Sequence, residues 1–193
     1  MRIILGSNSP RRKELIEKLE IDYIVAPADV DENIDADSFE ILVKELSRLK
    51  ADATAEKFKK KPDDSDCAVL GADTVVAVNG KVLGKPKDKE DAFRMLKLLS
   101  GNIHYVCTGV TNIPLWDESK TITFFETAKV SFISMSDNEI ADYVNSGEPM
   151  DKAGAYGIQG LGGRFIDRIE GDYYTIMGLP LCRVYQELKK ISE

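Results

Sequence analysis

Short apolar runs and longer amphipathic stretches alternate along the chain, and their order predicts the fold class. Apolar runs rich in Val and Ile are typical of strands, whereas apolar residues that recur every three to four positions are typical of helices. By these criteria we expect strands at 3–6, 21–25, 67–78, 103–113 and 121–134, and helices that begin near 10, 37, 88, 136 and 181. Strands and helices in alternation predict an α/β fold.

Two of the predicted helices begin with residue pairs that satisfy free backbone N–H groups. Asp37 and Glu40 resemble a capping pair at the start of the long second helix, and Ser136 and Glu139 match a capping box. An apolar stripe along the long helix predicts its buried face: Leu42, Leu46, Leu49 and Ala53.

Two arginines stand where a helix favours acids. Ser9 is the expected N-cap and Pro10 the expected first residue of the first helix, so Arg11 and Arg12 lie at its positive end. An anionic ligand would explain this placement, because the free N–H groups, the hydroxyls of Ser7 and Ser9 and the two guanidinium groups could all bind a phosphate chain. The alternative is a pair of solvated arginines.

Asp73 is the single charged residue in the apolar run 67–78, which reads as a strand covered on both faces. A carboxylate buried without a partner would be strongly destabilising, so Asp73 requires a cation, a metal ion or strong hydrogen-bond donors beside it. The two interpretations are a functional carboxylate and a structural salt bridge that fixes the strand.

Asn79 and Gly80 predict a two-residue hairpin turn after this strand. Folding about the turn pairs Val78 with Lys81, and continuing the register sets Thr74 opposite Lys85. We therefore expect Lys85 to emerge beside Asp73 and Thr74, with the contact to Asp73 diagonal at best. The alternative is an ordinary surface lysine.

The segment 147–163 contains six glycines in seventeen residues. Such a segment makes a poor helix or strand interior and predicts a shaped loop that a ligand can approach closely. The glycine spacing does not match a dinucleotide-binding fingerprint. By itself the loop indicates no particular chemistry.

The composition is that of an ordinary globular protein, with 193 residues, 43% of them apolar, and a net charge of −7. The negative charge argues against broad nucleic-acid binding. No apolar run approaches the length of a membrane span and no signal-peptide pattern is present, so we expect a cytoplasmic protein. The three cysteines lack metal-ligand spacing, and His104, the single histidine, lacks a motif partner and is expected to be structural.

Four motifs together closely resemble the Maf family, also called septum formation inhibitors: Ser-x-Ser-Pro-Arg-Arg at 7–12, Gly-Ala-Asp-Thr at 71–74, Gly-Lys-Pro at 84–86, and Glu-Pro-x-Asp-Lys-Ala-Gly-Ala-Tyr-Gly-Ile-Gln-Gly at 148–160. The resemblance covers essentially the whole chain in order. It implies a Maf/inosine-triphosphatase-like fold, in which an extended mixed sheet bends around a central cleft and is flanked by helices. It also implies a single domain over 1–193 of two closely joined lobes with the active-site cleft between them, often in a homodimer.

Members of the family are nucleoside triphosphate pyrophosphatases, which the resemblance implies here as well. Arg12, Thr74 and Gln159 occupy the positions that distinguish the dTTP/UTP branch from the 7-methyl-GTP branch. The implied reaction converts dTTP, UTP and modified pyrimidine triphosphates to the monophosphate and pyrophosphate. The alternatives are a 7-methyl-GTP or broad-specificity pyrophosphatase and, from another class, a non-catalytic nucleotide-binding regulator of cell division.

The motifs assign roles to individual residues under this resemblance. Asp73 is the expected proton acceptor and Lys85 a further catalytic residue. A divalent cation, Mg²⁺ or Mn²⁺, is the expected cofactor, with Glu32 and Asp73 as its ligands. Asp31 is an alternative to Glu32, and this acidic pair could equally be a solvated loop. The expected phosphate-binding residues are Ser7, Ser9, Arg11, Arg12, Lys50 and Lys85, and the expected specificity residues are Arg12, Thr74 and Gln159.

Overall fold

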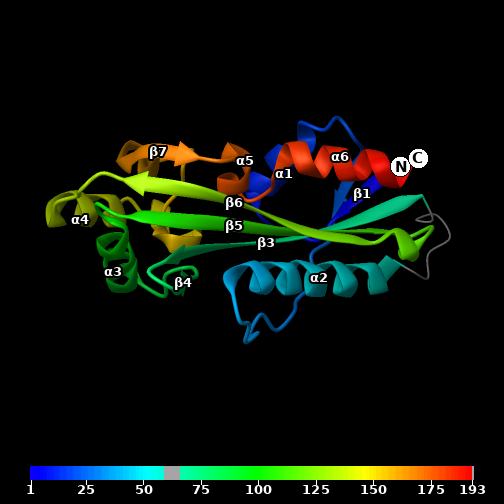
Figure 1. Cartoon of the computed structure of the whole chain (residues 1–193), viewed down its shortest axis with the longest axis horizontal. Coiled ribbons are helices and arrows are strands. Elements are labelled where there is room, and N and C mark those ends of the chain that lie inside the picture. Colours follow the sequence, from blue (N-terminus) through cyan, green and yellow to red (C-terminus); the bar gives the residue numbers. More distant parts are fainter. Residues whose placement is uncertain (59–65, 193) are drawn as a thin grey trace. The chain divides into compact units, whose positions relative to one another are not determined.

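A computed structural model describes residues 1–58 and 66–192 and contains a seven-stranded mixed sheet (Figure 1). The strands are β1 (Arg2–Leu5), β2 (Tyr23–Val25), β3 (Cys67–Val78), β4 (Lys81–Leu83), β5 (Ile103–Pro114), β6 (Ile122–Phe132) and β7 (Ile166–Glu170). Their order is β2-β1-β3-β5-β6-β7, with β4 paired to β3. β1 is parallel to β2 and β3, whereas β4 is antiparallel to β3 and β7 to β6. The predicted α/β class is confirmed, and the strand predicted at 67–78 has those bounds.

The chain divides into two compact units, neither of which is a continuous segment. Unit 1 comprises Met1–Asp73, Thr108–Glu126 and Gly178–Glu193, and unit 2 comprises Thr74–Cys107 and Thr127–Met177. The division cuts three strands, since β3, β5 and β6 each contribute residues to both units. In β3 it falls between Asp73 and Thr74.

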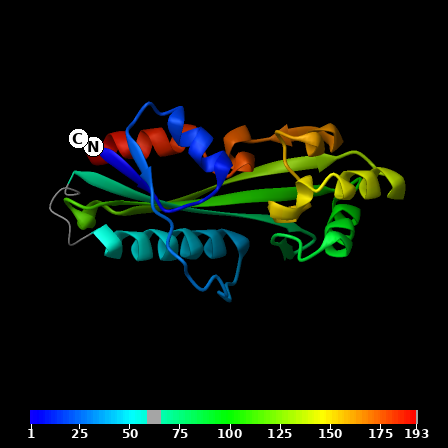
Figure 2. The ribbon, with the colours of Figure 1, turned by 180° about the vertical axis from the view of Figure 1, so that it is seen from behind.

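In unit 1, helices cover both faces of the sheet. Figures 1 and 2 show α2 (Phe39–Phe58) along one face, and α1 (Pro10–Glu17) with α6 (Leu181–Ser192) on the other. The short 3-10 helix η2 (Glu118–Lys120) lies between β5 and β6 in the chain. Ile4 of β1, Val69 of β3 and Ile113 of β5 form a buried cluster with Ala51 and Phe58 of α2. Helix α2 therefore buries one face of this part of the sheet.

Two glycines allow α2 to approach the strands closely. A Cβ added at Gly71 of β3 would lie 2.7 Å from the backbone nitrogen of Ala51, and one added at Gly109 of β5 would overlap the carbonyl of Val43. Both distances are far below ordinary van der Waals contact, so a side chain at either position would push the helix away. Backbone packs on backbone at these two points.

Two predictions about α2 are wrong, and the close approach to the strands explains the second of them. The helix begins at Phe39, and the Ser38 hydroxyl accepts from the Ile41 N–H at 3.3 Å, so Asp37 does not cap it. The buried face is also rotated from the predicted stripe, because small side chains face the glycine-bearing strands. The buried residues of α2 are Val43, Leu46, Ser47, Ala51, Thr54, Ala55 and Phe58, and only Leu46 is shared with the prediction.

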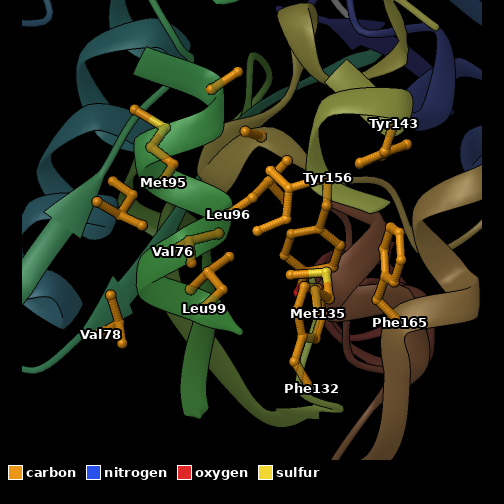
Figure 3. Packing of buried hydrophobic residues seen from close by; sticks show 14 of the residues in the cluster. Val76, Val78, Met95, Leu96, Leu99, Phe132, Met135, Tyr143, Tyr156 and Phe165 are labelled. Carbon is orange, nitrogen blue, oxygen red and sulfur yellow. The ribbon is translucent and has the colours of Figure 1, made fainter. Parts of the chain in front are cut away.

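Unit 2 has helices α3 (Lys89–Leu99), α4 (Asp137–Asn145) and α5 (Tyr173–Met177), and three 3-10 segments: η3 (Glu148–Asp151), η4 (Ala153–Ala155) and η5 (Leu161–Phe165). The predicted capping box of Ser136 and Glu139 is present at the start of α4. Figure 3 shows the core of this unit, where Tyr156 lies against Phe132 and Tyr143 against Phe165. The predicted glycine-rich loop is thus a series of short turns fixed by buried aromatic rings.

His104 of β5 is structural, as predicted. Its side chain is fully buried, and its Nε2 hydrogen-bonds the Tyr156 hydroxyl at 2.8 Å. Burial lowers the pKa of His104 from 6.5 to about 4. The imidazole is therefore neutral at physiological pH, and its hydrogen bond joins β5 to Tyr156 of the glycine-rich loop.

Across the described residues, every helix is too short or too polar to traverse a lipid bilayer.

Candidate functional site

The first helix begins where the sequence predicts. Pro10 is its first residue, and the Ser9 hydroxyl accepts from the backbone N–H of Arg12 at 3.5 Å. The first turn contains no acidic side chain. Arg11 and Arg12 therefore lie at the positive end of the helix dipole, which attracts anions.

Arg12 is held in a fixed position within unit 1. Its side chain is buried, with Nε donating to the Gly178 carbonyl at 2.8 Å and Nη1 donating to the Ser7 hydroxyl at 3.1 Å. Burial lowers the pKa of Arg12, and the charge of Asp73 opposes this effect. The alternative of a solvated arginine is wrong for Arg12, which is a buried and oriented cation.

Asp73 has the cationic partner that its burial requires, but that partner is Lys50 of α2. Lys50 Nζ lies 2.5 Å from Asp73 Oδ1 and 2.8 Å from Glu32 Oε1. The side chains of Lys50 and Asp73 are each 13% exposed, whereas Glu32 is 58% exposed. One lysine is therefore bound by two carboxylates, one largely buried and one at the surface.

The packing of α2 on β3 explains why Lys50 reaches Asp73. Gly71 and Asp73 are two residues apart in β3 and so point to the same face of the strand. Gly71 lies directly against the backbone of Ala51, the residue after Lys50. The close contact at the glycine brings the start of the lysine side chain near the carboxylate.

The predicted hairpin before Lys85 is confirmed, but the predicted pairing of Lys85 is not. Val78 pairs with Lys81 as expected, but the ladder ends at Val76 opposite Leu83. The extension that sets Thr74 opposite Lys85 is therefore wrong, because β4 ends at Leu83, just before Gly84. Lys85 is an exposed residue of unit 2, beyond the end of the paired strand.

The two predicted specificity residues after Asp73 both belong to unit 2. Thr74 is half-buried and follows Asp73 in β3, and Gln159 is exposed in the loop between Tyr156 and η5. Arg12, the third, belongs to unit 1. The structure thus assigns these residues to separate units and leaves their roles as predictions.

Glu148 is the first residue of the motif at 148–160, but the sequence analysis gave it no role, and in the structure its side chain holds the glycine-rich loop. Its carboxylate accepts from the N–H groups of Leu161 at 2.8 Å and Gly162 at 3.1 Å, and from the Tyr143 hydroxyl at 2.9 Å. A signal was present in the sequence, because an acid at the start of a glycine-rich segment can accept from several exposed backbone N–H groups.

The chemistry of Glu32 and Asp73 fits a hard divalent cation in part. Both supply carboxylate oxygens, and both converge on Lys50 Nζ. Among the described residues, no cluster of three or more His, Cys, Asp or Glu side chains suitable for a metal ion occurs. Mg²⁺ is commonly held by one or two carboxylates together with substrate phosphates, and this donor set matches that pattern.

Comparison with known proteins agrees with the motifs. The family described as Maf-like protein matches residues 2–191, and the chain belongs to this family. A dTTP/UTP pyrophosphatase of Clostridium perfringens is 48% identical over 191 residues, which cover 98% of this chain and 96% of that protein. A dTTP/UTP pyrophosphatase of Agathobacter rectalis is 46% identical, with 99% and 98% covered. The solved structure of the Staphylococcus aureus Ham1 protein is 19% identical with a TM-score of 0.49, covering 68% of this chain and 72% of that one.

Proposed function

We propose that this protein is a nucleoside triphosphate pyrophosphatase that hydrolyses dTTP and UTP to the nucleoside monophosphate and pyrophosphate. Its relatives of 46–48% identity over nearly the full length bear the name of this activity. The observation that carries the proposal is the ion pair of Asp73 with Lys50 in the same unit as the arginine-bearing start of α1. The unit thus contains both a carboxylate and an anion-binding helix start.

Ser7 and Lys50 are suited to bind phosphate because of the contacts that they already make. The Ser7 oxygen accepts from Arg12 Nη1 at 3.1 Å and from the Ser9 N–H at 3.2 Å, which uses both of its lone pairs. Its proton is then the group that it can offer to a ligand. Lys50 has three N–H donors, two of which serve Glu32 and Asp73, so the third can donate to a phosphate oxygen.

The remaining phosphate-binding groups in the proposal are three cationic side chains and one hydroxyl. Arg11 and Arg12 supply guanidinium groups at a helix N-terminus, and Ser9 supplies a hydroxyl there. Lys85 would neutralise charge on the phosphates as they separate, which is the role proposed for it as a catalytic residue.

Asp73 is proposed as the proton acceptor. Hydrolysis breaks the anhydride between the α and β phosphorus atoms, and the attacking water must lose a proton as its oxygen bonds to phosphorus. A positioned carboxylate can take that proton. The ion pair with Lys50 holds the carboxylate in one orientation, so Lys50 serves both the base and the substrate.

A divalent cation completes the proposal. Glu32 and Asp73 would hold Mg²⁺ or Mn²⁺ together with the substrate phosphates. When bound, the ion would neutralise part of the triphosphate charge and favour attack at phosphorus.

Base selection is assigned to Thr74 and Gln159, with Arg12 reading either the base or the phosphates. Uracil and thymine present an acceptor, a donor and an acceptor along one edge, and a side-chain amide can donate and accept against part of it. Gln159 carries such an amide on the exposed part of the loop.

The proposal is tested by measuring pyrophosphate release from dTTP, UTP, CTP, GTP and 7-methyl-GTP with Mg²⁺ or Mn²⁺. We expect dTTP and UTP to give the highest kcat/KM and activity to require the metal. A preference for 7-methyl-GTP would assign the chain to the other branch. Nucleotide binding without release would favour the non-catalytic regulator.

Replacing Gln159 with Ala tests base selection directly. We expect kcat/KM for dTTP and UTP to fall by about tenfold or more, because a partner left unpaired costs about 1 to 3 kcal/mol. The poor substrates should lose less. The matched control is Gln186→Ala, which removes an exposed amide from α6. Equal losses on all substrates would mean that Gln159 does not read the base.

The setting proposed for this activity is the cytoplasm, with a nucleotide and not a nucleic acid as substrate, in keeping with a net charge of −7. A homodimer is also proposed, and light scattering in solution measures that state directly.

A further inference from the structure

One carboxylate in unit 2 binds the C-terminal end of the segment 157–162, which is part of the glycine-rich loop. Glu148, the first residue of η3, accepts from the N–H groups of Leu161 at Oε2 and Gly162 at Oε1. Partial burial alone would raise the pKa of Glu148, but these hydrogen bonds and that from Tyr143 lower it below its usual value. The side chain is therefore ionised at neutral pH, the form that accepts most strongly.

The same carboxylate is linked through Tyr143 to the N-terminal end of the segment 157–162. The Tyr143 hydroxyl donates to Glu148 Oε1 at 2.9 Å and accepts from the Gly157 N–H at 3.3 Å. Tyr143 is itself fixed, since its ring is buried against Phe165 (Figure 3). Both ends of the segment 157–162 are thus bonded to one Glu-Tyr pair, and Gln159 lies in the middle of the segment.

The glycines of this segment match the shape of that pair. A Cβ at Gly160 would lie 2.5 Å from the carboxyl carbon of Glu148, and a Cβ at Gly162 would lie 2.5 Å from the Tyr143 hydroxyl. Both are shorter than real Cβ contacts, so the loop backbone can pass over the pair only where side chains are absent. The backbone of the loop therefore lies directly against the carboxyl group of Glu148.

We propose that Glu148 is a positioning residue for base selection, holding the loop so that Gln159 presents its amide in one fixed orientation. This inference rests on the proposed function, because it concerns the substrate that Gln159 would read. Glu148 itself need not touch the nucleotide. Its effect passes through the backbone N–H groups on either side of Gln159, and an amide fixed in advance discriminates between bases better than a mobile one.

The kinetic test compares Glu148→Gln and Glu148→Ala with the unmodified protein on dTTP, UTP, CTP and GTP. We expect kcat/KM for dTTP and UTP to fall by about tenfold to a hundredfold in Glu148→Ala, mainly through KM, as expected when hydrogen bonds to a charged group are lost. The preference over CTP and GTP should shrink. Glu148→Gln should lose less, because its carbonyl oxygen can still accept one of the N–H groups.

Inhibition by inorganic pyrophosphate separates loop order from general damage. Its inhibition constant should stay within about twofold, because pyrophosphate has no base for the loop to position. The control variant is Glu139→Gln, which alters the capping box of α4 in the same unit and should leave substrate preference unchanged. Unchanged preference in Glu148→Ala, or an equal loss of preference in Glu139→Gln, would overturn the proposal.

Amide hydrogen exchange tests the same idea without any turnover. In Glu148→Ala, the amides of Leu161 and Gly162 should exchange faster, and Tyr143→Phe should have the same effect at Gly157. Tyr143→Phe also serves if Glu148→Ala does not fold, because it keeps the buried ring and removes only the hydroxyl. Unchanged exchange at 157–162 would refute the loop-holding role even if the enzyme hydrolyses dTTP. Failure of the unmodified protein to hydrolyse dTTP would instead refute the proposed function.

Discussion

At the scale of single residues, Asp73 combines two demands that usually conflict. A buried carboxylate is stable only with a partner, yet a proton acceptor must remain able to take a proton. Lys50 meets the first demand by donating to Oδ1, and Glu32 shares the charge of the lysine. The lysine is thus anchored from two sides.

Replacing Asp73 with Asn tests the proposed base. The neutral amide keeps the shape of the side chain, so the fold and nucleotide binding should persist while kcat falls by about 10² to 10⁴. Asp52→Asn is the matched control, because Asp52 is an exposed acid of α2 that pairs with Arg48. Retention of more than roughly a tenth of kcat in Asp73→Asn would favour the structural salt bridge instead.

His104 predicts how stability depends on pH. The unfolded chain binds a proton on histidine near pH 6.5, while the folded protein resists protonation until about pH 4. Stability therefore falls as the pH drops from 6.5 to 4, by about 3 kcal/mol in total at 1.36 kcal/mol per pKa unit.

Denaturant unfolding of the unmodified protein and of His104→Gln, at pH 7.5 and pH 4.5, measures this contribution. Gln can still donate to the Tyr156 hydroxyl but does not titrate, so its free energy of unfolding should depend less on pH. Equal pH dependence in the two proteins would mean that His104 is not the group that titrates.

The residues that could be recognised from the sequence are those that violate a local rule. Arg12 places a cation at a helix start, and Asp73 places an acid in an apolar strand, so each needs an explanation from outside its own element. Lys50 and Glu148 violate no such rule. Lysine is ordinary in a helix, and its contact with Asp73 depends on the packing of α2 on β3. The resemblance to the family implied a phosphate-binding role for Lys50 and no contact with Asp73.

At the scale of elements, the fit of α2 onto β3 depends on the missing side chain of Gly71. In Gly71→Ala, the added methyl group would overlap the helix backbone at Ser47 and Ala51. We expect a loss of stability of about 1 to 3 kcal/mol, as for other overpacked sites. We also expect a lower kcat, because Lys50 would move with the helix.

Thermal unfolding and steady-state kinetics of Gly71→Ala check both expectations. Gly84→Ala is the stability control, since a Cβ at that position meets no atom of the described residues within 4 Å. A Gly71→Ala protein with unchanged melting temperature would show that the helix can shift freely, and the proposed coupling of α2 to Asp73 would be wrong.

Elements with strong local signals were predicted well, and those decided by tertiary packing were not. The twelve-residue apolar run 67–78 and the capping box at Ser136 need only neighbouring residues, and both were confirmed. The buried face of α2 was wrong because the pattern of large apolar residues favoured Leu42 and Leu49. The sheet instead selects Ser47 and Ala51, whose small side chains suit a strand that carries glycine.

At the scale of the whole molecule, the two units are interleaved in sequence and share three strands. A domain that unfolds independently normally contains whole strands. Here β3, β5 and β6 each continue from one unit into the other, so unfolding of these strands in one unit disrupts residues that are covalently continuous with the other. We therefore expect a single cooperative unfolding transition, with equal calorimetric and van't Hoff enthalpies. Two resolved transitions in differential scanning calorimetry would contradict this expectation.

The sequence predicted the α/β class from the alternation of strand and helix patterns and the family from four motifs, and both kinds of signal can be read in order along the chain. The sequence did not predict where the boundaries between the two units fall. A linker between two continuous domains is recognised by its composition, whereas a boundary inside β3, between Asp73 and Thr74, has no such signature.

Gly71 also determines the register in which β3 lies beneath α2. Only a position without a side chain fits against the helix backbone there, so sliding the strand by two residues would bring Val69 or Asp73 into a space that neither can occupy. A slip of one residue would place Ala72 at this position, where its methyl group would overlap the helix backbone, and would turn Asp73 to the opposite face of the sheet. The bare backbone at Gly71 thus keeps the Asp73 carboxylate on the face where it meets Lys50.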